Sequence, residues 1–147
     1  MTAAANVHTL TVRREVPASP TDLFDAWLDA GKLASWMRPG DSQRSKVRLD
    51  PRVGGEFKVD MRTSSGEVPH TGTYKAIDRP NRLAFTWNSP AAGSRDSLVT
   101  IDFRPVGRAT EVVLKHENLL SDEEVEGHLK GWTRILELMS QSYAQAA

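Results

Sequence analysis

The sequence predicts an α+β domain that combines an antiparallel sheet of about six or seven strands with a long C-terminal helix and two short helices after the first strand. Three observations predict this class. Apolar and polar residues alternate through most of residues 45–118, which is the period of half-buried strands. Short turns separate the alternating segments, as in an antiparallel meander. After residue 121 the apolar spacing changes to three and four, as in an amphipathic helix.

The N-terminal part predicts one strand and two short helices. The expected ranges are 8–16 for the strand and 19–30 and 32–37 for the helices. Ser19 is suited to cap the first helix, and Pro20 is suited to its first turn. We expect Gly31 to end that helix, and Pro39-Gly40 to end the second one.

The central part predicts the meander. Its expected strands are residues 45–49, 55–63, 71–78, 83–87, 97–105 and 110–117. Segments rich in turn formers separate several of them, at 64–67, 79–82 and 89–96. Within each strand the apolar residues share one face, as Phe57 and Val59 do in the second of these strands. That face should point to the interior.

The C-terminal part predicts a helix over about 122–144, which at 1.5 Å per residue is roughly 34 Å long and can cross a whole sheet. Ser121 and Glu124 have the spacing of a capping box. The expected apolar stripe consists of Val125, Leu129, Trp132, Leu136, Met139 and Tyr143.

Length and composition restrict the possible function classes. The 147 residues fit one domain over 1–147, with an ordered core of about 8–145. The 19 basic and 19 acidic residues cancel, which argues against a nucleic-acid or anionic-membrane partner. The chain has no cysteine, so disulfides and thiolate chemistry are excluded. The N-terminal residues do not resemble a signal peptide, and no apolar run is long enough to span a bilayer. We therefore expect a cytoplasmic protein.

The order of these elements, together with six local motifs, resembles a known superfamily. The motifs are VPASPTDLFDAWLD, LASWM, GGEF, GTYKAIDRPNRLAFTW, VTIDFRPVGRATEVVLKH and HLKGWTRILELM. The chain resembles the START-like, or Bet v 1-like (SRPBCC), superfamily. More narrowly, it is similar to the bacterial branch related to the C-terminal domain of the activator of heat-shock protein 90 ATPase. The resemblance covers roughly residues 8–145 and implies a helix-grip fold, in which a curved antiparallel sheet wraps around the C-terminal helix.

The resemblance also implies an apolar cavity between the concave face of the sheet and the long helix. Strand and helix phase select the candidate ligand-binding residues. They are Trp36, Phe57, Val59, Met61, Tyr74, Phe85, Trp87, Ile101, Phe103, Val112, Leu114 and Trp132. Small-molecule pockets are typically apolar with a few placed polar groups. The alternative is that these side chains simply fill a core, as apolar stripes usually do.

Two histidines are the main polar candidates for this interior. His116 is in phase with Val112 and Leu114, and His128 lies at the edge of the apolar stripe of the helix. Either imidazole could orient a ligand. Each could equally be a partly buried histidine whose hydrogen bonds are satisfied by backbone or water. The hydroxyl of Tyr74 has the same two interpretations.

The sequence contains no recognisable catalytic or metal-binding motif, so we name no catalytic residue, metal ligand or cofactor. Three function classes remain. The preferred one is binding of an apolar or aromatic small molecule in the cavity. The second is a chaperone-associated or stress-response interaction protein, although the eukaryotic co-chaperone has a further N-terminal domain that this chain does not show. The third is a cyclase- or hydrolase-like enzyme. A filled core with an exposed apolar patch would favour the protein partner, and an inward acid–base pair would favour the enzyme.

Overall fold

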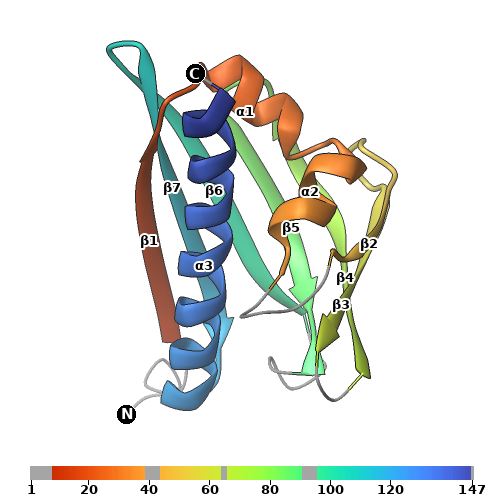
Figure 1. Ribbon diagram of the computed structural model, residues 1–147. Coiled ribbons are helices and arrows are strands. Elements are labelled where there is room, and N and C mark those ends of the chain that lie inside the picture. The colour runs from red at the N-terminus through yellow and green to blue at the C-terminus, as the bar shows by residue number, and fades with distance from the viewer. Residues whose placement is uncertain (1–7, 39–43, 64–65, 91–95, 147) are drawn as a thin grey trace.

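The computed structural model describes residues 8–38, 44–63, 66–90 and 96–146, and it confirms the predicted fold class. One strand and two helices come first, then six strands and a long helix (Figure 1). The elements are β1 (His8–Val16), α1 (Pro20–Ala26), α2 (Ala30–Trp36), β2 (Lys46–Leu49), β3 (Glu56–Thr63), β4 (Gly66–Asp78), β5 (Arg82–Asn88), β6 (Asp96–Val106), β7 (Ala109–Leu119) and α3 (Asp122–Ala146). The predicted helix stop at Pro39-Gly40 and parts of the predicted turns at 64–67 and 89–96 lie outside the described residues.

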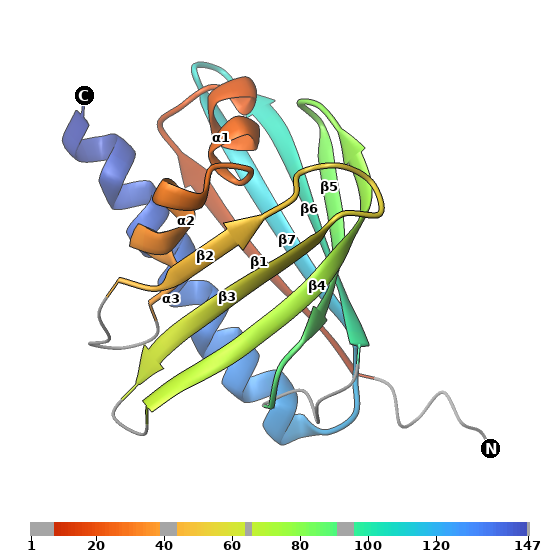
Figure 2. The same ribbon diagram turned by 90° about the vertical axis from the view of Figure 1, so that its right-hand side faces the viewer.

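The seven strands form one antiparallel sheet in the order β1-β7-β6-β5-β4-β3-β2. The strands from β2 to β7 follow each other as a meander, and β1 closes the other edge beside β7. Figure 2 shows β2, β3 and β4 crossing in front of β1 and β7, so the sheet curls strongly. Its concave face holds α3, while α1 and α2 lie beside α3 near one end of the sheet.

The two short helices begin at side-chain caps, but one predicted boundary is wrong. Ser19 Oγ accepts a hydrogen bond from the amide of Asp22 at 3.1 Å, as its cap position predicts. The first helix ends at Ala26, and Gly31 lies inside α2 instead of ending α1. The physical reason is a second cap, because Asp29 Oδ1 accepts from the amide of Lys32 at 3.1 Å and starts a new helix.

The Ser121 half of the predicted capping box of α3 forms, with Ser121 Oγ accepting from the amide of Glu124 at 3.1 Å. The carboxylate of Glu124 accepts from the amide of Leu120, one residue before the cap, at 3.1 Å. The predicted apolar stripe is wrong at Leu129, which is 40% exposed. At 3.6 residues per turn the sheet-facing side passes through His128 and Ile135, and Leu129 lies to one side of it.

The core lies between the concave face of the sheet and the helices. Buried side chains alternate along the strands, as they do in β6 with Val99, Ile101 and Phe103. The helix α3 contributes Trp132, which is 2% exposed, and its ring centroid lies 4.9 Å from that of Trp87 on β5. This pair of indoles holds the middle of α3 against the sheet.

Truncating Trp132 should therefore weaken the whole fold. We expect Trp132→Ala to lower the free energy of unfolding by about 3–5 kcal/mol, as for other buried aromatic side chains. Urea unfolding followed by far-UV circular dichroism measures the change. Leu129→Ala on the same helix is the matched control and should cost less than about 1 kcal/mol because this residue is 40% exposed. Equal losses in the two variants would contradict the docking of α3 through Trp132.

Candidate functional site

A small cavity lies within the core, among residues from the sheet, α2 and the end of α1. Its volume is about 20 Å³, enough for about one water molecule. The lining residues are Trp27, Leu33, Met37, Leu49, Phe57, Val59, Tyr74, Phe85 and Trp87. None of these side chains is charged, and four of them are aromatic residues of the sheet. The cavity has the apolar character of a ligand site, but it is too small for an organic molecule.

Five of the predicted site residues line this cavity: Phe57, Val59, Tyr74, Phe85 and Trp87. The other predicted residues are all buried but do not line it: Trp36, Met61, Ile101, Phe103, Val112, Leu114, His116, His128 and Trp132. Trp36 packs instead against Trp27 and Tyr143, with ring centroids 6.3 and 6.2 Å away. The prediction from strand phase thus gave the correct face of the sheet, but it did not locate the open space on that face.

Four lining residues were not predicted: Trp27, Leu33, Met37 and Leu49. Leu33 and Met37 are four residues apart, so they project from the same side of α2 toward the sheet. That spacing is visible in the sequence and could have placed both of them. Leu49 ends the short edge strand β2, where Val47 and Leu49 alternate with charged residues, so its inward direction was also visible in the sequence.

His116 lies at the centre of a closed chain of hydrogen bonds beside this region. It is 0% exposed, and its Nδ1 accepts from Trp132 Nε1 at 3.0 Å. An indole nitrogen can only donate, so Nδ1 carries no proton. The proton is then on Nε2, which donates to Ser97 Oγ at 2.6 Å. Ser97 Oγ donates in turn to the carbonyl oxygen of Trp87 at 2.7 Å. Both ring nitrogens of His116 are therefore engaged within the protein, which favours the structural interpretation of this histidine.

His128 and His70 flank this chain. The ring of His128 contacts that of His116 edge-on at 4.8 Å, and its Nδ1 donates to the carbonyl oxygen of Glu124 at 2.7 Å. His70 was not expected to face inward, but it is 8% exposed and its ring lies 5.1 Å from that of Trp87. Burial lowers the pKa of both His70 and His128 below the ordinary value of 6.5. The polar end of the interior is thus an uncharged group of histidines at neutral pH.

Trp87 carries an unsatisfied polar atom into this interior. The side chain is 2% exposed, and its indole Nε1 has no acceptor among the described residues. Buried polar groups are normally hydrogen-bonded, so each exception calls for an explanation. Since Trp87 lines the cavity, a bound molecule is one such explanation.

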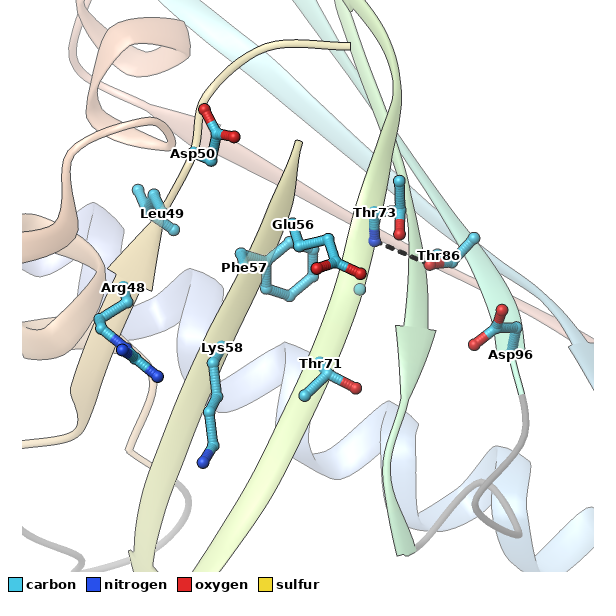
Figure 3. Close-up of a pocket in the computed structure, with 11 residues that line it drawn as sticks. Arg48, Leu49, Asp50, Glu56, Phe57, Lys58, Thr71, Thr73, Thr86 and Asp96 are labelled. Carbon is cyan, nitrogen blue, oxygen red and sulfur yellow. Dashed lines mark hydrogen bonds between the residues drawn. The ribbon is translucent and has the colours of Figure 1, made fainter. Parts of the chain in front are cut away.

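A larger groove of about 580 Å³ lies on the opposite side of the same strands. Figure 3 shows it on the face of the sheet turned away from α3, with threonines and charged side chains of both signs around it. Leu49 and Phe57 line both the groove and the cavity. Gly72 permits this arrangement, because a Cβ atom there would lie 2.4 Å from the Phe57 ring and 1.9 Å from the carbonyl oxygen of Thr86. Leu49 and Phe57 therefore lie between the cavity and this outer groove.

No group of three or more histidine or acidic side chains is arranged to hold a metal ion in the part of the chain that the structure describes. Over the same residues, no helix combines the length and the apolar character needed to cross a membrane.

The buried histidines should make stability depend on pH. Because their pKa values are lower in the folded state, the unfolded chain binds more protons once the pH falls below about 6.5. The free energy of unfolding should therefore fall as the pH is lowered from 7.5 to 5.0, as measured by urea unfolding at each pH. The hydrogen bond to Arg79 lowers the pKa of Asp25 from its ordinary value of 3.8, so Asp25 changes the free energy of unfolding only at pH values near or below 3.8. The double variant His70→Asn/His128→Asn keeps a donor at each Nδ1 position and should reduce the change of unfolding free energy with pH. An unchanged pH dependence would contradict its assignment to these two histidines.

Comparison with known proteins places this fold in a family. A family model described as "Activator of Hsp90 ATPase homolog 1-like protein" matches residues 17–143. A solved protein from Chromobacterium violaceum is 22% identical, with a TM-score of 0.77 over 92% of this chain and 97% of the other. One from Mesorhizobium loti is 21% identical, with a TM-score of 0.77 over 95% and 99%. A search of curated proteins finds no match.

One similar structure has a stated activity. It is an HSP90 activator from Plasmodium falciparum, 25% identical, with a TM-score of 0.69 over 86% of this chain and 88% of the other. Because the family model covers most of the chain, the protein belongs to the Activator of Hsp90 ATPase homolog 1-like family.

Proposed function

We propose that this protein binds a small apolar or aromatic molecule between its sheet and its helices. The observation that carries the proposal is the cavity, which lies within a wall of uncharged and mostly apolar or aromatic side chains. An apolar molecule gains affinity from the area that it buries, at roughly 25 cal/mol per Å² before the costs of association. The lack of cysteine in the sequence is compatible with the reducing cytoplasm, where we propose that it acts.

A ligand has to enlarge the cavity, and the elements at its edge are suited to yield. Leu33 lies on α2, a helix of 7 residues, and Met37 directly follows it. Leu49 lies on β2, an edge strand of 4 residues that has a single neighbour in the sheet. Methionine is unbranched and adapts readily to a new shape. We propose that these three side chains move aside while the aromatic residues of β3, β4 and β5 form the fixed wall.

The predicted site residues then divide into two groups. Phe57, Val59, Tyr74, Phe85 and Trp87 would touch the ligand directly, because they line the cavity. The others are buried outside the cavity lining and would hold the wall in place: Trp36, Met61, Ile101, Phe103, Val112, Leu114, His116, His128 and Trp132.

Filling the cavity from within should block binding without unfolding the protein. Val59→Ile adds one methylene group to a side chain that lines the cavity. We expect the free energy of unfolding to stay within about 1 kcal/mol of the original or to rise, as for cavity-filling substitutions. The affinity for the neutral fluorescent probe N-phenyl-1-naphthylamine should fall at least severalfold, as measured by fluorescence titration.

Val112→Ile is the matched control. Val112 is 0% exposed and does not line the cavity, so the added methylene group should cost about 1–3 kcal/mol through overpacking. Probe affinity should then be retained by the folded fraction. If the unmodified protein takes up neither this probe nor small aromatic compounds, the ligand-binding proposal is wrong.

A second candidate is a chaperone-associated role, favoured by the likeness to the HSP90 activator from Plasmodium falciparum. On this proposal the protein binds an Hsp90-type chaperone and changes its rate of ATP hydrolysis. The test mixes the purified protein with Hsp90 and measures both co-elution and ATPase rate. Stimulation that persists in Val59→Ile would separate this role from ligand binding, and no complex at micromolar concentrations would count against it.

A further inference from the structure

The indole of Trp87 differs from two other buried indoles of the core in having no hydrogen-bond acceptor. Trp27 Nε1 donates to Met139 Sδ at 3.3 Å, and Trp132 Nε1 donates to His116 Nδ1 at 3.0 Å. Trp87 Nε1 is equally buried but has no partner among the described residues. An indole nitrogen cannot accept instead. Leaving such a donor unpaired costs more than a hydrogen bond gains.

A water molecule alone is a poor partner for this donor. The cavity is large enough for about one water, but a buried water typically makes two to four hydrogen bonds. Apart from the two indoles, Tyr74 is the only lining side chain with a polar atom other than sulfur, and the remainder are aliphatic or plain aromatic. Two more buried hydroxyls, those of Ser89 and Tyr143, lack a partner among the described residues, but neither residue lines the cavity. A weakly held water is readily displaced by an organic ligand.

The surroundings of Trp87 also restrict the charge of a ligand. No side chain that lines the cavity carries a charge. The ring of His70 lies next to that of Trp87, with the two ring centroids 5.1 Å apart. Burial lowers the pKa of His70 and of His128, so both are neutral at pH 7. An ionised ligand would lose its hydration without meeting an opposite charge, which is strongly unfavourable.

We infer that the ligand of this cavity is a neutral, mainly aromatic molecule with one hydrogen-bond acceptor, such as a ketone or an ether, which receives the indole N–H of Trp87. This inference rests on the proposed ligand-binding function and adds the chemical class of the ligand. It makes Trp87 the residue that selects the acceptor, while the aromatic wall provides the area for binding.

A matched pair of ligands tests the inference. Indane and 1-indanone have the same bicyclic shape and differ by one carbonyl group. The affinity of each is measured by displacement of N-phenyl-1-naphthylamine, and the ratio of the two affinities is compared between variants. Differences in hydration of the free ligands cancel in this comparison. Trp87→Phe keeps an aromatic ring but removes the donor, and it should shift the ratio against 1-indanone by about tenfold, the value of one buried hydrogen bond.

Trp27→Phe is the matched control, since Trp27 lines the same cavity but its indole is already engaged by Met139. It should leave the ratio unchanged. If both ligands bind and the ratio is the same in all three proteins, the role of Trp87 is wrong while the proposed function stands. If neither ligand displaces the probe and the probe itself does not bind, the proposed function fails.

A second measurement does not depend on the variants being folded. In ¹⁵N-labelled unmodified protein, 1-indanone should shift the indole N–H resonance of Trp87 downfield, and indane should not. The indole resonance of Trp27 serves as the internal reference. Binding of 1-indanone without any selective shift of the Trp87 resonance would overturn the inference.

Discussion

The contact between Trp132 and the sheet is the interaction on which the rest of the structure depends. The indole packs on Trp87 and donates its N–H to His116, so one side chain fixes both the rotation of α3 and the protonation of a buried histidine. His116 then orders Ser97, and Ser97 reaches the carbonyl of Trp87. This series of hydrogen bonds thereby ends on β5, the strand on which Trp132 packs. A satisfied polar network of this kind specifies one arrangement of helix and sheet, because any other rotation of α3 would leave buried donors without acceptors.

This docking also determines where space remains in the core. Trp132 fills the middle of the concave face, and Val112 and Leu114 lie fully buried on β7. The open volume is therefore found toward α2 and the edge strand β2, where short elements cover the sheet. Short edge elements have few neighbours and open at lower free-energy cost than the centre of a sheet. The region best able to admit a molecule is thus the region that α3 does not cover.

The sequence predicts which face of each strand points to the interior better than it predicts where the interior contains a cavity. Alternation places Phe57, Val59 and Phe85 toward the interior, and the structure agrees, because a strand has only two faces. His70 was not predicted to face inward, because β4 begins at Gly66, several residues before apolar and polar residues clearly alternate along this strand. Packing is a further step that periodicity does not describe. Whether Val112 meets a cavity or a neighbouring side chain depends on volumes contributed by distant segments, and no local pattern in the sequence records their sum.

The indole N–H of Trp87, which has no acceptor among the described residues, relates the stability of this core to the proposed function. A phenylalanine at this position would provide a similar ring without an unsatisfied donor, so stability alone gives no reason for the N–H group. The neighbouring indole of Trp132 shows that the fold can supply an acceptor where it needs one. Binding and catalytic sites are the places where proteins depart from full internal satisfaction, because groups paired within the protein are not available to a ligand. On the proposed function, a ligand in the cavity that Trp87 lines would supply the acceptor that this donor lacks among the described residues.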